Sequence, residues 1–222
     1  MSKNRTVPAR MPERVSTSSR EQRDRLLTDT NIGHFAFVDD GRPVVMPSAF
    51  ANTDDALILH GSTGSWWLRK LAAGTPVTAS IMVVDGIVYA RSAFESSMRY
   101  RSAILFGSCE RVEGDEKLAA LDLVTEGLLP GRITEVRAHN RKELAATLVL
   151  RMNIDEWTFK HSTEWPEDPD DDIATDVWAG VLPLVTTYGE PLTAPDLRDG
   201  IPLASSVERL TGTSRVSPWA SF

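Results

Sequence analysis

Residues 76–91 read Pro76-Val-Thr-Ala-Ser-Ile-Met-Val-Val-Asp-Gly-Ile-Val-Tyr-Ala-Arg91. Two apolar segments rich in β-branched residues flank the Asp85-Gly86 pair, and such residues are enriched in strands. An Asp-Gly pair between two strand-like segments is a strong signal for a tight hairpin turn. The stretch therefore predicts two antiparallel strands, over 76–84 and 87–91, with the turn at Asp85-Gly86.

Further strand-like segments lie on both sides of this hairpin. They predict strands over 34–38, 42–50, 56–60, 100–112, 147–152 and 156–160. Gly107 marks a possible bulge in the longest of them. Short strands at regular spacing favour a mainly β fold, an antiparallel barrel of at least six strands, over alternating β-α-β units.

Three helices are expected beside the strands. One spans 18–27 behind the capping-box pattern of Ser18 and Glu21, one spans 66–73 before Gly74, and one spans about 115–127. The number is too small for a helix between each pair of strands, which again favours antiparallel pairing.

Length and composition favour one folded domain. A chain of 222 residues with 41% hydrophobic residues can bury one well-packed core and is below the size at which a second core is expected. Residues 1–17 lack periodicity and predict a flexible N-terminal arm. We expect the barrel domain over 18–190 and a C-terminal extension over 191–222. The acidic run at 167–172 predicts a solvated loop.

Charge and apolar patterning exclude several classes of protein. The formal net charge of −7 argues against sequence-independent binding of nucleic acid, which needs a basic face. No apolar run approaches the roughly 18 residues of a membrane span, and no secretory signal is seen, so we expect a cytoplasmic protein. Cys109 lies in an apolar stretch, which favours a packed thiol over a reactive one.

The segment 56–73 is the most informative candidate site. It reads as a strand, the small-residue loop His60-Gly-Ser-Thr-Gly-Ser65, and a helix. A loop that enters a helix presents unpaired backbone N–H groups and the positive end of the helix dipole to an anion. Neither the P-loop motif nor G-x-G-x-x-G is present, so a phosphate site and an ordinary helix start both remain open.

Metal and hydrolytic chemistry have little support in the sequence. The histidines, which are His34, His60, His139 and His161, show no H-x-x-x-H or H-E-x-x-H spacing, and there is no second cysteine. No G-x-S-x-G nucleophile motif is present. No metal site and no covalent hydrolysis are predicted.

Seven segments follow one another over about residues 20–190. They are Gly41-Arg-Pro-Val-Val-Met-Pro47, Leu57-Ile-Leu-His-Gly-Ser62, Val84-Asp-Gly-Ile-Val-Tyr-Ala-Arg-Ser-Ala-Phe94, Ser97-Met-Arg-Tyr-Arg-Ser102, Pro130-Gly-Arg132, Glu143-Leu-Ala-Ala-Thr147 and Trp178-Ala-Gly-Val-Leu-Pro-Leu184. This ordered set resembles the pyridoxamine-5′-phosphate-oxidase-related flavin-nucleotide-binding proteins, nearest the branch of the nitroimidazole-resistance reductases.

The resemblance implies a six-stranded antiparallel split barrel and a homodimer with two FMN sites at the subunit interface. It places the flavin phosphate at the loop after His60 and gives His60 a catalytic position near the flavin. Trp178 either closes over the site or fills an interface or the core. The implied cofactor-binding residues are Met46, Pro47, His60, Gly61, Ser62, Ser65, Trp66, Lys70, Tyr100, Arg101, Ser102 and Trp178.

Trp66 departs from the family pattern at the start of the helix. Relatives commonly carry a Ser-Arg pair where this chain has Ser65-Trp66, and an indole cannot make the bidentate contact that Arg makes to phosphate. Arg69, Lys70, Arg99 or Arg101 could supply the missing charge, and Arg101 is the preferred anchor over Arg69.

The predicted function is an FMN-dependent oxidoreductase that passes hydride equivalents to a small electrophilic or aromatic acceptor. The expected partners are a small-molecule substrate and a second copy of the chain, without nucleic acid or membrane. Two alternatives remain open. One is a deazaflavin coenzyme or haem in the same cleft, and the other is a non-catalytic flavin-binding or sensing protein.

Overall fold

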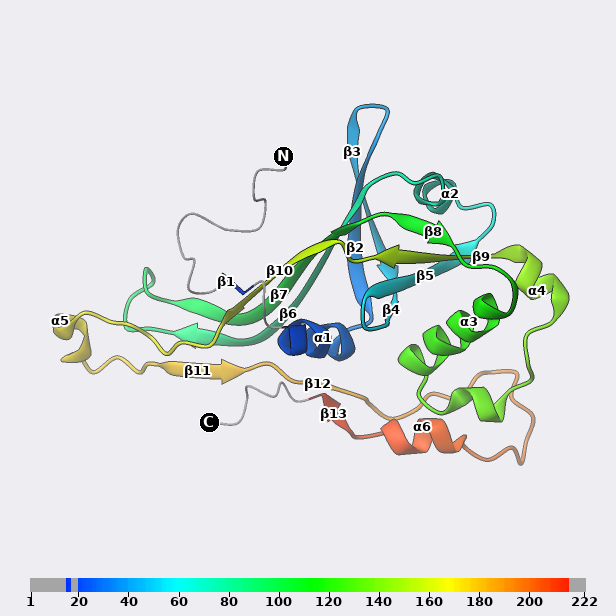
Figure 1. The fold of residues 1–222 in the computed structure, drawn as a ribbon. Coiled ribbons are helices and arrows are strands. Elements are labelled where there is room, and N and C mark those ends of the chain that lie inside the picture. Colours follow the sequence, from blue (N-terminus) through cyan, green and yellow to red (C-terminus); the bar gives the residue numbers. More distant parts are fainter. Residues whose placement is uncertain (1–14, 17–19, 216–222) are drawn as a thin grey trace.

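Two antiparallel sheets make up most of the chain (Figure 1). The computed structural model describes residues 15–16 and 20–215. The larger sheet has the strand order β1-β10-β7-β6-β2-β3, and β11 pairs with the far half of β6, beyond the part that β2 contacts. Its strands are β1 (Val15–Ser16), β2 (Ile32–Asp39), β3 (Arg42–Ala49), β6 (Val77–Tyr89), β7 (Ser97–Gly107), β10 (Glu156–Ser162) and β11 (Gly180–Pro183).

The smaller sheet has the order β4-β5-β9-β8, and β12 pairs with β13. These strands are β4 (Ala51–Asn52), β5 (Ala56–Ser62), β8 (Cys109–Arg111), β9 (Thr147–Asn153), β12 (Thr186–Thr187) and β13 (Ser214–Arg215). The helices are α1 (Arg20–Asp29), α2 (Trp66–Ala72), α3 (Gly114–Leu128), α4 (Arg141–Ala146), α5 (Asp170–Ile173) and α6 (Ser205–Leu210), with a 3-10 helix at Arg132–Glu135.

Apolar side chains from both sheets meet in the main core. Phe35 on β2, Leu59 on β5 and Phe159 on β10 are fully buried in one continuous cluster. Side chains alternate along a strand, so the other face of the smaller sheet packs on α3, through Val149 and Leu121. The larger sheet does not close on itself, and the predicted mainly β, antiparallel split barrel is confirmed.

The predicted hairpin at Asp85-Gly86 is wrong, because β6 runs through both residues as one strand. The connection to β7 lies instead at residues 90–96. The register between β6 and β7 shifts at this point, which makes Asp85 part of a β-bulge. Asp85 is held inside by an ion pair with Arg101, and Gly86 pairs with Pro183 of β11. These tertiary contacts keep the chain extended where the local sequence favours a turn.

The chain crosses from the larger to the smaller sheet directly after Gly107. β7 ends at Gly107 and β8 begins at Cys109, so the single strand predicted over 100–112 is two strands in different sheets. A Cβ on Gly107 would lie 1.8 Å from the backbone oxygen of Asn153. Glycine therefore marks a close backbone approach at the crossing, not a bulge.

The sequence predicted a solvated acidic run at 167–172 and a packed thiol at Cys109, and the structure confirms only the second. The acidic run at 167–172 is not simply a solvated loop, because its last three residues begin α5 and because the Asp168 carboxylate is fully buried. That carboxylate accepts hydrogen bonds from the backbone N–H and the guanidinium of Arg91, at 2.7 and 2.9 Å.

Cys109 is buried as expected, and burial raises the pKa of its thiol to about 12, so the packed-thiol interpretation is confirmed.

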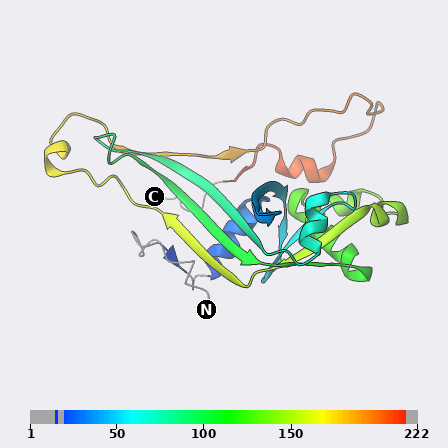
Figure 2. The ribbon, with the colours of Figure 1, turned by 90° about the horizontal axis from the view of Figure 1, so that it is seen from above.

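Residues 163–215, called the strap here, run along the larger sheet and then turn back past α3. Figure 2 shows β6 and β7 extending together as a long ribbon, with α5 at its far end and the strap returning beside it. Within the strap, α6 lies beside the 3-10 helix, where the backbone N–H and hydroxyl of Ser206 donate to the carboxylate of Glu135 at 2.8 and 2.6 Å. The strap thus contributes one strand, β11, to the larger sheet and then closes over the α1 and α3 side of the barrel.

Two further expectations concern the ends of the chain and membranes. The flexible arm predicted over 1–17 falls mostly outside the described residues, and only β1 within it is described, paired with β10. Among residues 15–16 and 20–215, no helix is long and apolar enough to cross a membrane.

Candidate functional site

The loop after β5 has the strand-loop-helix form that the sequence predicts, and its backbone donors are already largely used. The N–H of Thr63 donates to Ala146 at 2.9 Å, the N–H of Ser65 donates to the Ser62 carbonyl at 2.9 Å, and the N–H of Gly64 donates to the Ser62 hydroxyl at 3.1 Å. An anion here would meet the first N–H groups of α2, which have no partner within the helix. Gly61 is needed for packing, since a Cβ would lie 2.7 Å from the Leu68 side chain.

His60 stands at the entrance to this loop, half-buried on β5. Its Nδ1 is buried, and no hydrogen-bond partner for it exists within residues 15–16 and 20–215. Burial lowers the pKa of His60, because the charged imidazolium loses solvation. The side chain is therefore a neutral imidazole near pH 7, which is the form that binds a metal ion or accepts a proton.

Trp66 and Lys70 place different groups on α2. The Trp66 side chain is 48% exposed and packs at a tilt against Phe37, with ring centroids 6.0 Å apart. The Lys70 ammonium lies 2.5 Å from the carboxylate of Asp39, and this hydrogen bond raises the pKa of Lys70. The helix thus presents an aromatic surface at its start, while its last-turn lysine is engaged with β2.

The three predicted residues on β7 do not face the same way. Side chains alternate along a strand, so Tyr100 and Ser102 share one face of the larger sheet and Arg101 points to the other. Pro47 lies on the Tyr100 face of the sheet. It pairs with His34 on β2, His34 pairs with Ser80 on β6, and Ser80 pairs with Ile104, which is on the same face of β7 as Tyr100. Lys160 joins the same face, with its ammonium 5.6 Å from the centre of the Tyr100 ring.

Arg101 is held in a buried ion cluster. Its Nε and Nη2 each donate to Asp85 at 2.9 Å, and its Nη1 donates to Asp29 at the end of α1. Burial alone would lower the pKa of Arg101, but the hydrogen bonds to the two carboxylates raise it overall. The side chain is only 2% exposed, so its donors serve the fold before any ligand.

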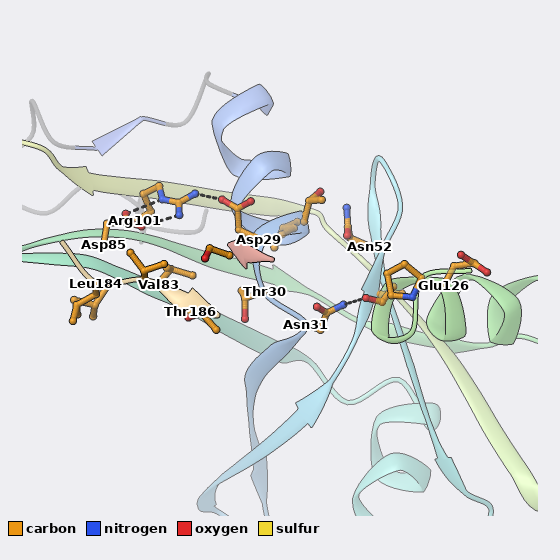
Figure 3. Close-up of a pocket in the computed structure, with 18 of the residues that line it drawn as sticks. Asp29, Thr30, Asn31, Asn52, Val83, Asp85, Arg101, Glu126, Leu184 and Thr186 are labelled. Carbon is orange, nitrogen blue, oxygen red and sulfur yellow. Dashed lines mark hydrogen bonds and ion pairs between the residues drawn. The ribbon is translucent and has the colours of Figure 1, made fainter. Parts of the chain in front are cut away.

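A cavity of about 880 Å³ opens on the Arg101 face, between α1, α3, β4, β6 and the strap (Figure 3). Arg101 is the one predicted site residue that lines it. Its other polar lining residues, none of which the sequence assigned to a site, are Thr28, Asp29, Thr30, Asn31, Asn52, Asp85, Glu126, Thr186 and Ser214. No local motif marks them as one site, because they come from segments that are far apart in the sequence.

The remaining predicted residues lie elsewhere. Met46 on β3 is half-buried against the main core. Trp178, in the strap, is 68% exposed and packs against Tyr89, with ring centroids 6.0 Å apart. The predicted residues therefore divide between the His60 loop with α2, the Tyr100 face of the larger sheet, the cavity behind it, and the strap.

An open antiparallel barrel that carries a strand-loop-helix segment beside a half-buried histidine defines a protein of the split-barrel class. The family model for pyridoxamine 5′-phosphate oxidase matches residues 19–161. The chain belongs to this family.

Two solved structures are similar to this chain well beyond the residues 19–161 that the family model matches. The FAD and haem binding protein from Mycobacterium smegmatis is 50% identical, over 92% of this chain and 100% of that chain, with a TM-score of 0.86. The flavocytochrome Anf3 from Azotobacter vinelandii is 27% identical, over 95% and 98% of the two chains, with a TM-score of 0.84. A candidate 5-nitroimidazole antibiotic resistance protein from Bacteroides thetaiotaomicron, 22% identical over 66% and 87% of the two chains with a TM-score of 0.57, shares the fold. No curated protein matches the chain.

Proposed function

We propose that this chain is a redox protein that binds both a flavin nucleotide and a haem, and that its flavin is FAD. The observation that carries the proposal is the 50% identity, over 92% of the chain, to a protein that binds FAD and haem. A flavocytochrome is also similar over 95% of the chain. Both likenesses include much of the strap, which lies outside the family region at 19–161. The sequence alone predicted FMN, and the dinucleotide is proposed on the strength of the first likeness.

The His60 loop and α2 fit the phosphate end of a flavin. The Ser62 and Ser65 hydroxyls and the first N–H groups of α2 are the donors available there, and Trp66 offers a partly exposed aromatic surface. Lys70 is engaged by Asp39, so neutral donors and the helix end carry most of the binding. A bound flavin supplies hydride and one-electron chemistry, while the chain orients and anchors it.

His60 fits the role of an iron ligand. A haem needs an axial side chain, most often a neutral histidine. His60 is held neutral by burial, is partly accessible, and has a buried Nδ1 without a partner in the described part of the chain. His34 and His139, by contrast, are exposed to solvent.

The test is the absorption spectrum of the full chain after reconstitution with haem and with FAD or FMN. We expect a flavin band, with FAD held more tightly than FMN, together with a Soret band. Coordination by His60 should shift the Soret band away from its position in free haem. His60→Ala should remove this shift and keep the flavin band, whereas the matched control His139→Ala should keep the shifted Soret band and the flavin band. A reconstituted chain that shows only one of the two bands, or neither, would contradict the proposal, and an unchanged Soret band in His60→Ala would reject the assigned ligand.

A further inference from the structure

A second cavity, of about 600 Å³, lies where the β2–β3 hairpin leaves the larger sheet. β2 pairs with β6 through His34–Ala36, and the hairpin continues past this pairing to its turn at Asp40-Gly41. Figure 1 shows the hairpin rising away from β6 and β7. The cavity is called the hairpin groove here, and it is bordered by residues 36–38 and 43–45 of the hairpin and by residues 76–78 at the start of β6.

One row of side chains crosses the floor of the hairpin groove. Residues that pair directly on neighbouring antiparallel strands point to the same face of a sheet. The row crosses five strands, from β3 to β10, and consists of Val45, Ala36, Thr78, Phe106 and Glu156. Neighbouring strands lie about 4.8 Å apart, so this floor is roughly 19 Å wide. A floor of this width, with an aromatic ring in it, has room for a nucleoside.

The lining of the hairpin groove suits an uncharged, largely flat group that also donates hydrogen bonds. No lysine or arginine is among the residues that line it, so the groove offers no cation to a phosphate. Val38, Pro43 and Phe106 supply apolar and aromatic surface, and a nucleobase stacks readily on an aromatic side chain. Ser108 and Asp155 supply a hydroxyl and an exposed carboxylate at the β7–β10 end. A carboxylate is the group that binds ribose hydroxyls in many dinucleotide sites.

The hairpin groove adjoins the place proposed for the flavin phosphate. Phe37 lines the groove, and its ring centroid lies 6.0 Å from that of Trp66, the first residue of α2. On the other side, Val45 is two residues from Pro47, so both lie on the same face of β3. A nucleotide that is anchored at the start of α2 can therefore extend past Phe37 into the groove.

We propose that the hairpin groove binds the adenosine half of FAD. The inference rests on the proposed function, because it takes the flavin phosphate to lie at the His60 loop and α2. Phe106 and the apolar floor hold the adenine, and Asp155 accepts hydrogen bonds from the ribose hydroxyls. FMN ends at its phosphate and leaves the groove empty, so these contacts favour FAD over FMN.

Fluorescence titration of the full chain with FAD and with FMN measures this preference. We expect the unmodified chain to bind FAD more tightly than FMN. Asp155→Asn should weaken FAD roughly tenfold and leave FMN unchanged, as expected for the loss of a charged hydrogen bond. Asp171→Asn, the matched change on α5 and outside the groove, should alter neither affinity.

Filling the hairpin groove gives a second test that does not depend on Asp155. Val45→Trp, at an exposed position of the floor, should weaken FAD roughly tenfold or more and spare FMN, whose binding also reports that the variant is folded. Leu118→Trp, at an exposed position on α3, should alter neither affinity. If Val45→Trp keeps the FAD-to-FMN preference of the unmodified chain, the groove assignment is overturned and FAD binding itself stands. If the unmodified chain binds FMN as tightly as FAD, both the groove assignment and the choice of FAD are overturned.

Discussion

At the scale of single residues, His60 links burial to pH dependence. Its pKa is lowered in the folded chain, so the unfolded chain takes up the proton first as the pH falls below about 6.5. The stability that depends on neutral His60 is thus complete above that pH and is lost below it. We expect the free energy of unfolding, measured with urea, to fall between about pH 7.5 and about pH 5, and to fall less in His60→Gln. His139→Gln, at an exposed position, should follow the wild type. Identical pH profiles for His60→Gln and wild type would contradict this reading.

Gly107 is the residue at which the sheet crossing is most sensitive to an added methyl group. Its Cβ would lie 1.8 Å from a backbone oxygen, which cannot rotate away as a side chain could. Gly107→Ala should therefore destabilise the fold by about 1–3 kcal/mol or more, measured by chemical denaturation. Gly189→Ala is the matched control, because its added Cβ has no atom within 4 Å. Equal stabilities of the two variants would show that the crossing can relax.

At the scale of elements, the Arg101 cluster ties α1, β6 and β7 together. Asp85 stays inside the bulge of β6 only because Arg101 balances its charge. Arg101→Leu should cost about 3–5 kcal/mol of unfolding free energy, since it leaves a buried carboxylate without its partner. Adding Asp85→Leu should recover much of this loss, because the buried carboxylate is then gone and only the partly exposed Asp29 still lacks Arg101. Denaturation of the two variants and of Asp85→Leu alone gives the coupling, and additive losses would argue against a shared ion pair.

At the scale of the whole molecule, we propose a homodimer formed through the extended ribbon and strap. Large apolar side chains are exposed there, including Met82, Met98, Trp165 and Trp178. Contiguous exposed apolar surface is a mark of an interface, and symmetric pairing is the commonest assembly. Light scattering at micromolar concentration should give twice the chain mass of 24.5 kDa.

A charged substitution tests which surface makes this dimer. Met82→Glu, on β6, should lower the measured mass toward that of one chain, because a carboxylate is costly to bury in an apolar interface. Val45→Glu, at a comparably exposed position on β3, should leave the dimer intact. A monomer in the unmodified protein would remove the basis for a site shared between subunits.

Local sequence determined the type and place of most elements. The helix predicted over 115–127 is Gly114–Leu128, and the strand predicted over 156–160 is Glu156–Ser162. Periodicity and turn residues act between near neighbours, so they can be read without knowing the fold. The His60 loop was also found in this way, because its chemistry lies in one continuous segment.

Only the tertiary structure decided what Asp85 and Arg101 do. Asp85-Gly86 has the local chemistry of a turn, yet the ion pair to Arg101 and the pairing with β11 keep it extended within β6. The tertiary structure also brings residues from 27–31, 83–85, 123–127 and 184–186 around one cavity. Long-range pairing and burial of charge depend on which segments meet, and no local pattern encodes that meeting. The sequence by itself therefore determined the barrel and the loop, while the fold decided where charge is buried and which residues share a site.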